Sequence, residues 1–348
     1  MKLHHLLIAC LITFNARSPE AWALDQRDAT GEYLKTWRQI DAEFGDSQIE
    51  RLRRYKLILV PGFLSDLVIN SGAPGNPCQA DKHFDDQMCW LERLAVPFQR
   101  INMKADESLS RNAEILEEAI EASEQDVILI SHSKGGIDSL EALLTRPAAR
   151  QKVKGWISIQ APFFGSLLAD WALKEGIRPL VEKALKEHGK SIESLESMQT
   201  LERKAYYSIH KEQIDGLVGA IPVLSFSSWK DEESGWQADT FFSLLRGLLF
   251  QWIGVKNDGM VPLASQVLPG ADFVRVPHLN HDDTVMPQCV EFDRVRFTKT
   301  LLSMLLKRLD APPETSNPPA GASAGTSPID PKEIAVGPIL QESGLSGP

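Results

Sequence analysis

Cysteine is scarce in this chain, and its spacing does not suit a metal site. The four cysteines are Cys10, Cys78, Cys89 and Cys289 of 348 residues. Structural zinc sites often place cysteine ligands in close pairs, and the spacing of these cysteines matches no such site. From the sequence we predict neither a metal ligand nor a cofactor.

Basic residues and long apolar runs are also in short supply. Lys and Arg total 37 against 47 for Asp and Glu, which gives a formal net charge of −10. No basic face is evident, so we predict no nucleic-acid partner. Beyond the N-terminal stretch no segment is long and apolar enough to span a bilayer, so we predict no transmembrane segment in the mature chain. No internal repeat is found, and the length suffices for one large domain.

The first residues have the pattern of a secretory signal. The apolar run Leu6 to Phe14 is too short to span a bilayer, and Ala21-Trp22-Ala23 forms a small-x-small cleavage site before Leu24. We predict that residues 1–23 are a signal peptide and that the protein is secreted or periplasmic. Lipoprotein processing at Cys10 is a less favoured alternative, because the apolar stretch before it is very short. An ordinary N-terminal helix is the other alternative.

The C-terminal segment differs in composition from the rest of the chain. Residues 311–348 are rich in proline, glycine, alanine and serine and contain no aromatic residue. Such a segment cannot bury enough apolar surface to fold, so we predict a disordered tail.

The rest of the chain is organised around a serine that follows a short apolar run. Val127 to Ile130 is typical of a strand buried on both faces, and Gly135-Gly136 leads into a predicted helix over 137–144. A serine on such a tight turn, here Ser133, holds its hydroxyl clear of the sheet, as in a nucleophile elbow. Ser131 stands where that motif usually has glycine. The alternative is an ordinary strand–turn–helix with a chance serine.

Helices and strands are predicted to alternate along the chain. The predicted strands are 55–60, 99–103, 127–130, 155–160, 222–227 and 273–276. The predicted helices lie within 25–54, 137–144, 167–214, 241–253 and 290–309. A further helix is predicted to begin after Ser108, which serves as its N-cap. This alternation predicts an α/β domain over 24–310, with a mostly parallel central sheet flanked by helices. Residues 64–89 contain glycines and prolines and are predicted to form a long loop beside the active-site mouth.

These motifs resemble the α/β-hydrolase superfamily, and more narrowly the secreted bacterial triacylglycerol lipases and their esterase relatives. The resemblance covers roughly residues 55–305 through short motifs in the right order, including Ala161-Pro162-Phe163-Phe164-Gly165-Ser166 after the strand 155–160. It implies a helical cap or lid, about residues 166–214, that would cover the active site and contact a lipid surface. A helix pair packed permanently on the core is the alternative.

In this fold the serine is followed along the chain by an acid and then by a histidine. The relatives carry an Asn-His pair followed by Asp after the last strand, and Asn280-His281-Asp282-Asp283 matches this pattern. We therefore predict His281 as the base in preference to His278, which follows the same strand. His188 and His210 lie on predicted helices and are expected to be solvated.

The acid is predicted from a second match to the relatives. Asn257-Asp258-Gly259-Met260-Val261 resembles their acid motif, and Gly259 permits a sharp turn that would aim the carboxylate at His281. The predicted catalytic residues are therefore Ser133, Asp258 and His281. Asp231, just past the strand 222–227, is the alternative acid.

Two backbone N–H groups should bind the developing oxyanion. By resemblance they are those of Phe63 and Lys134, although Pro61-Gly62 stands where the relatives have His-Gly. Asp283 matches one calcium ligand of some relatives, but we find no complete ligand set.

A disulfide between Cys78 and Cys89 is predicted, because in an oxidising compartment it would tie down the polar loop between them. Two free thiols are the alternative. Cys289 is expected to be a buried thiol.

The sequence thus predicts a secreted serine esterase or lipase that cleaves a small-molecule or lipid ester through an acyl-enzyme. Hydrolysis of another acyl bond by the same fold remains open: a polyester such as polyhydroxyalkanoate, a thioester or an amide. A non-catalytic binding protein of this fold is a further alternative, disfavoured because all three catalytic residue types occur in order.

Overall fold

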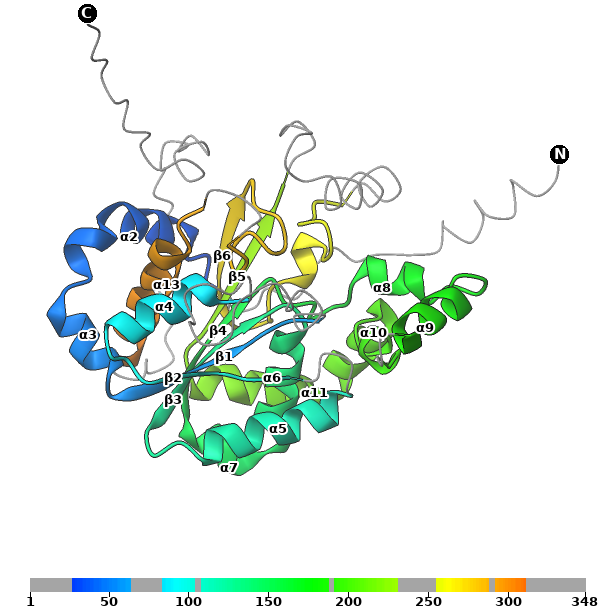
Figure 1. Ribbon diagram of the computed structural model, residues 1–348, viewed down its shortest axis with the longest axis horizontal. Helices are drawn as coiled ribbons and strands as arrows, with labels where there is room; N and C mark the ends of the chain where they lie inside the picture. The colour runs from blue at the N-terminus through cyan, green and yellow to red at the C-terminus, as the bar shows by residue number, and fades with distance from the viewer. Residues whose placement is uncertain are drawn as a thin grey trace, which may run out of the picture.

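The structure is a computed structural model, and it describes residues 27–63, 83–103, 108–187, 191–230, 255–287 and 292–310. Its centre is a six-stranded sheet in the order β2-β1-β3-β4-β5-β6, in which every neighbouring pair is parallel (Figure 1). The strands are β1 (Tyr55–Val60), β2 (Phe98–Arg100), β3 (Asp126–His132), β4 (Val153–Ile159), β5 (Val223–Trp229) and β6 (Asp272–Pro277). The six predicted strands are confirmed, with small differences at their ends.

Helices cover both faces of this sheet. They are α2 (Thr30–Glu43), α3 (Asp46–Leu52), α4 (Asp85–Arg93), α5 (Leu109–Glu121), α6 (Lys134–Thr145), α7 (Pro147–Lys152), α8 (Leu167–Ala172), α9 (Arg178–Glu187), α10 (Glu193–Glu196), α11 (Thr200–Ala220) and α13 (Arg294–Asp310), with a short 3₁₀ helix, η3 (Leu263–Ser265). The predicted N-cap is confirmed, since the Ser108 hydroxyl accepts from the backbone N–H of Arg111.

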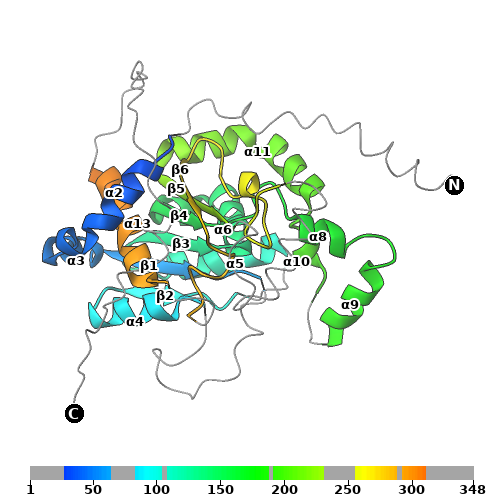
Figure 2. The same cartoon turned by 90° about the horizontal axis from the view of Figure 1, so that it is seen from above.

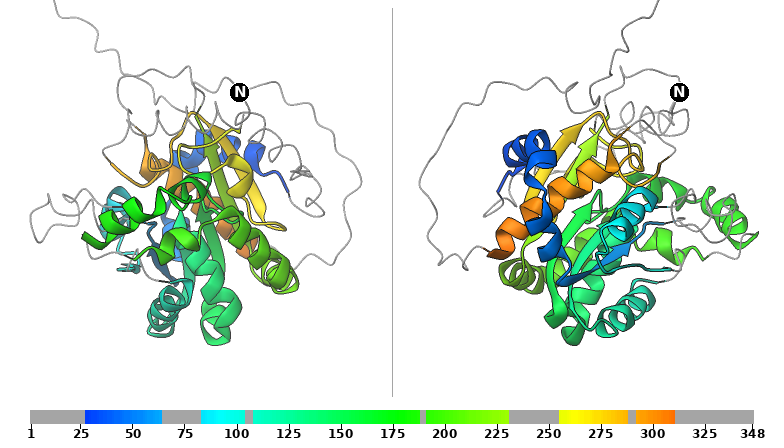
Figure 3. Two further views of the ribbon diagram at one scale, coloured as in Figure 1. Left: turned by 90° about the vertical axis from the view of Figure 1, so that its right-hand side faces the viewer. Right: turned by 60° about the vertical axis from the view of Figure 1, so that its left-hand side comes forward.

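The two faces of the sheet bury two separate cores. Alternate residues of a strand point to opposite faces, so Leu57 and Leu59 of β1 pack with α2, α4 and α13, and Ile58 and Val60 pack with α5, α6 and α11. Figures 2 and 3 show α2 and α13 side by side on one side of the sheet and α11 on the other. The prediction of a parallel sheet flanked by helices is confirmed.

An ion-pair network joins the start of the described chain to its end. The carboxylate of Asp272 in β6 accepts from Arg27 Nη2 and from Arg308 Nε of α13, both at 2.7 Å. Burial raises the pKa of Asp272, but the two arginines outweigh it and hold the pKa below its ordinary value. These contacts fasten β6, and with it the loop that follows β6, to the outer helices.

Two sequence predictions are corrected by the structure. The predicted loop 64–89 ends early, because α4 begins at Asp85: its first turn carries Asp85 and Asp86, which favour a helix N-terminus, and it buries Trp90 and Leu91. The region 167–214 is divided among four helices, and Gly176 at φ +89 lies in the break between the first two, α8 and α9.

Within the described ranges, no helix combines the length and apolarity needed to cross a membrane. The predicted signal peptide, the helix 241–253 and the C-terminal tail lie outside the described residues.

Candidate active site

The site is built on the turn between β3 and α6. Ser133 sits there at φ +54, a conformation that costs free energy for any residue other than glycine. Its neighbours must be small. A Cβ on Gly135 would come within 2.5 Å of the Val60 carbonyl oxygen, and one on Gly136 within 2.3 Å of the Ala161 side chain. The two glycines therefore let α6 start directly against the strands that flank β3.

The serine at position 131 has a structural explanation. The indole Nε1–H of Trp156 in β4 donates to the Ser131 hydroxyl at 2.8 Å, and both side chains are fully buried. A buried indole needs an acceptor, and glycine would supply none. Serine in place of the usual glycine thus gives the buried Trp156 indole a hydrogen-bond acceptor.

The side chain that reaches Ser133 is that of His281. Its Nε2 lies 2.7 Å from Ser133 Oγ, and its Nδ1 lies 2.8 Å from Asp258 Oδ2. The backbone strengthens this arrangement, because the N–H of His281 donates to the Asp258 carbonyl oxygen at 2.9 Å. All three side chains are buried. Because a carboxylate only accepts, Nδ1 carries the proton and Nε2 presents its lone pair to the serine hydroxyl.

Asp258 is fully buried and is surrounded by donors. Its Oδ1 accepts from the backbone N–H groups of Met260 and Val261 at 3.0 and 2.8 Å. Its Oδ2 accepts from Gln160 Nε2 at 3.1 Å and Gln266 Nε2 at 3.2 Å, in addition to the histidine. These donors hold the carboxylate in the orientation in which it faces His281.

The charge of Asp258 acts on the histidine. Burial lowers the pKa of His281, but the charge and hydrogen bond of Asp258 outweigh burial and leave that pKa above its ordinary value. The site therefore stabilises a proton on His281, as a base needs when it takes the proton of a serine hydroxyl.

The loop after β1 approaches the serine closely. A Cβ on Gly62 would lie 2.7 Å from Ser133 Cβ, so only glycine allows this approach. The predicted oxyanion donors lie on either side of the contact: Phe63 follows Gly62, and Lys134 is the first residue of α6. The first N–H groups of a helix have no acceptor within the helix, so the Lys134 N–H is available to a ligand.

The Lys134 side chain is turned away into the protein. Its Nζ lies 2.7 and 3.0 Å from the two carboxylate oxygens of Asp138, and both residues are buried. Asn112 donates to the same carboxylate at 3.1 Å. Burial raises the pKa of Asp138, and the lysine opposes this shift. The pair fixes the first turn of α6, which carries the N–H of Lys134.

Solved structures that are similar to this chain include a carboxyl esterase and a lipase. A metagenomic carboxyl esterase is similar over 74% of this chain and 76% of its own, with a TM-score of 0.61 and 21% identity. The mature form of the Bacillus licheniformis lipase BlEst2 is similar over 73% of this chain and 91% of its own, with a TM-score of 0.52 and 20% identity. The fold is that of the α/β-hydrolases.

A family model matches the central part of this chain. Residues 93–200 match the family described as lecithin:cholesterol acyltransferase. The match runs from the end of α4 to the start of α11 and includes Ser133. The sequence has no significant match among curated proteins.

Other residues considered from the sequence lie elsewhere. His278 adopts a positive φ of 69° and is half-buried, but Ser133 is reached by His281. His210 lies on α11 beside Gln213. Asp231 and His188 lie outside the described residues.

The predicted disulfide is described only at one end. Cys89 lies in α4 and is disulfide-bonded, whereas Cys10, Cys78 and Cys289 lie outside the described residues. The pairing of Cys78 with Cys89 stays a prediction.

Sequence reasoning missed Gln160 and Gln266. Gln160 directly follows β4 at φ +51, and its Nε2 also contacts Ser228 Oγ at 2.7 Å and the Asn280 carbonyl oxygen at 3.0 Å. Glutamines follow no spacing rule relative to an aspartate. The one available signal was the position of Gln160 at the carboxyl end of a predicted strand, where this fold places its site.

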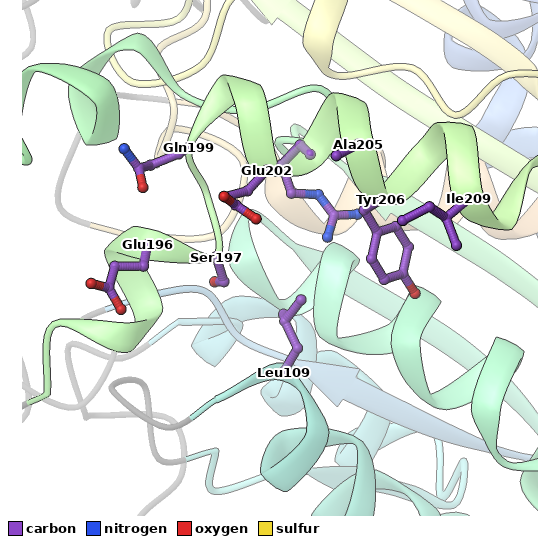
Figure 4. Close-up of a pocket in the computed structure, with 9 residues that line it drawn as sticks. Leu109, Glu196, Ser197, Gln199, Glu202, Ala205, Tyr206 and Ile209 are labelled. Carbon is purple, nitrogen blue, oxygen red and sulfur yellow. The ribbon is translucent and has the colours of Figure 1, made fainter.

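A cavity of about 500 Å³ lies between the start of α5 and the helices α10 and α11 (Figure 4). Leu109, Tyr206 and Ile209 form its apolar part, and Arg203 lies with its guanidinium 4.2 Å from the Tyr206 ring centroid. Ser133 is not among its lining residues. The hydrogen bonds around Ser133, rather than this cavity, therefore locate the candidate site.

Proposed function

We propose that this α/β-hydrolase is a serine hydrolase that cleaves carboxylic esters. Ser133 is the nucleophile, His281 the general base and Asp258 the residue that orients the histidine. The observation that carries the proposal is the continuous hydrogen-bonded chain from Ser133 Oγ through the imidazole to the Asp258 carboxylate, at 2.7 and 2.8 Å. In this chain the carboxylate accepts from Nδ1 and the Nε2 lone pair faces the serine hydroxyl, as a general base requires.

The reaction follows from this geometry. Ser133 Oγ attacks the ester carbonyl carbon while His281 Nε2 takes the hydroxyl proton. The carbonyl oxygen becomes an oxyanion, to which the N–H groups of Phe63 and Lys134 donate. The intermediate then collapses, the C–O bond to the alcohol breaks, and His281 gives its proton to the leaving oxygen. Water repeats these steps on the acyl-enzyme and releases the acid.

The comparisons support the acyl class of chemistry. The two similar solved structures are named a carboxyl esterase and a lipase, and the matching family model is named for an acyltransferase. We therefore propose an ester or lipid substrate. Water is the acceptor of the acyl group in this proposal. Transfer to an alcohol would instead form a new ester.

We further propose that α8 and α9 contact a lipid surface. No residue of α9 is buried, and Leu180 and Trp171 are 69% and 40% exposed. Both helices project from the body of the domain (Figures 1 and 2). Exposed apolar side chains on a helix of mixed charge suit the boundary between water and an apolar phase. We also propose export through residues 1–23.

The test is hydrolysis of p-nitrophenyl esters across acyl lengths, with emulsified triglyceride alongside, by purified wild-type protein and Ser133→Ala. We expect ester hydrolysis that the substitution lowers by up to about 10⁶ in kcat. Added alcohol reports acyl transfer through the new ester that it forms. Equal rates for both proteins would refute the proposal.

A further inference from the structure

Two histidines and an aspartate gather beside His281 from three separate parts of the chain. His83 lies just before α4, His132 ends β3, and Asp282 follows His281 in the loop after β6. One ring nitrogen of each histidine and one carboxylate oxygen of Asp282 lie within 4.8 Å of one another. The His83 and His132 rings meet edge to face, with centroids 5.4 Å apart.

The two histidines are incompletely satisfied. Both are buried, and in the part of the chain that the structure describes the Nδ1 atom of each has no hydrogen-bond partner. The Nε2 atom of His132 lies 2.8 Å from the carbonyl oxygen of His281, which can only accept, so Nε2 carries the proton and Nδ1 the lone pair. A buried polar atom without a partner is uncommon in folded proteins, and an ion bound to Nδ1 of His132 and Nε2 of His83, the nitrogen that faces Asp282, would satisfy the first of these rings.

The local charge favours a cation. Nε2 of His83 already lies 3.9 Å from Oδ1 of Asp282, so an imidazole and a carboxylate face the same point. Asp282 lies near two other carboxylates, Asp258 and Asp283, and beside the imidazole of His281. Three carboxylates against one arginine and the imidazole of His281 leave an excess of acidic groups around the cluster.

We propose that His83, His132 and Asp282 form a binding site for a transition-metal ion of the Zn²⁺ type. Two imidazoles and a carboxylate are a common ligand set for such ions, whereas Ca²⁺ prefers six to eight oxygens. Ligands of a tetrahedral zinc ion lie roughly 3.4 Å apart, so the three side chains need to close by one to two ångströms at most. The Asp282 side chain is 26% exposed and gives the ion a path of entry.

The ion would join three segments that are distant in sequence: the start of α4, the end of β3 and the loop of His281. It would therefore stabilise the surroundings of the proposed base without contacting Ser133. The sequence did not suggest the site, because its members are separated by about 50 and 150 residues.

The experiment is calorimetric titration of chelator-treated, dialysed protein with ZnCl₂, together with thermal melting in ZnCl₂ or CaCl₂. We expect one equivalent of Zn²⁺ to bind and to raise Tm, because an ion that binds only the folded state stabilises it, and no such rise with Ca²⁺. Asp282→Asn and His83→Gln should each weaken binding at least tenfold. His210→Gln, which alters a histidine of α11, is the matched control and should leave binding unchanged.

If His83→Gln fails to fold, Asp282→Asn still tests the zinc site. Asparagine has the same shape as aspartate, and position 282 is partly exposed. Co²⁺ in place of Zn²⁺ should give visible absorption typical of four- or five-coordinate cobalt in the wild type, and Asp282→Asn should lose it. The proposal is overturned if the wild type binds no Zn²⁺, or if Asp282→Asn binds with unchanged affinity. No substrate is involved, so the result is independent of the proposed ester hydrolysis.

Discussion

Replacing Asp258 by asparagine alters one atom of the proposed acid and places an NH₂ donor among the donors that surround it. Asp258 Oδ1 accepts from two backbone N–H groups, and Oδ2 accepts from His281, Gln160 and Gln266. Five donors thus meet a group that, as a carboxylate, only accepts. An asparagine in the same place must turn its NH₂ group toward one set of donors or the other.

The backbone donors are fixed, so the amide oxygen should remain with them and the NH₂ group should face the histidine. His281 must then present the lone pair of Nδ1, which moves its proton to Nε2. In that tautomer the ring donates to Ser133 Oγ and cannot take its proton. The loss expected from a wrong tautomer is on the order of 10⁴ in kcat. The Nε2 groups of Gln160 and Gln266 would each lose one acceptor but keep the others that they contact.

The assay is kcat and KM on a short p-nitrophenyl ester, with melting measured on the same preparation. We expect kcat to fall by about four powers of ten while the variant still unfolds cooperatively. Asp231→Asn is the matched control, since Asp231 is the alternative acid, and it should be nearly silent. An Asp258→Asn protein within tenfold of the wild-type kcat would refute the reasoning, and a large loss in Asp231→Asn would move the acid to that residue.

Three further predictions concern stability and the outer helices. Ser131→Ala removes the acceptor of the Trp156 indole and should lower the free energy of unfolding by about 1–3 kcal/mol in urea denaturation; no change would mean that the contact contributes nothing. Asp272→Asn should cost about 1 kcal/mol at neutral pH. Because ion pairs hold the pKa of Asp272 below its unfolded value, this difference should persist above about pH 4 and vanish as pH falls through the folded pKa, and a difference that grows in acid would contradict it. Replacing Leu180 and Val181 by serine should slow hydrolysis of emulsified long-chain esters and spare short soluble ones; equal effects on both would make α9 a fixed structural element.

The sequence was most informative where local pattern decides structure. Apolar runs such as Tyr55–Val60 and Val127–Ile130 predicted the buried parallel strands, since both faces of the sheet are covered. The start of α4 was missed, because the glycines and prolines before it and its polar first turn, Asp85-Asp86-Gln87, are typical of a loop. The two aspartates that favour a helix N-terminus were the local signal, but the burial of Trp90 against the core could not be predicted from the sequence.

Only part of the candidate site could likewise be predicted from the sequence. The order of Ser133, Asp258 and His281 could be predicted from short motifs, but their mutual contact depends on how β3, β5 and β6 bring three loops to one edge of the sheet. Gln160 and Gln266 could not be predicted, because only the fold brings their amides to Asp258.

The central claim is that Ser133 is a nucleophile activated by His281. The most direct measurement is reaction of the protein with a fluorophosphonate, followed by digestion and mass spectrometry of the labelled peptide. The account predicts one phosphonate per chain, on Ser133, and none on Ser133→Ala or, in the same reaction time, on His281→Ala. A protein that hydrolyses esters but carries the label on another residue, or labels Ser133→Ala as fast as the wild type, would contradict it.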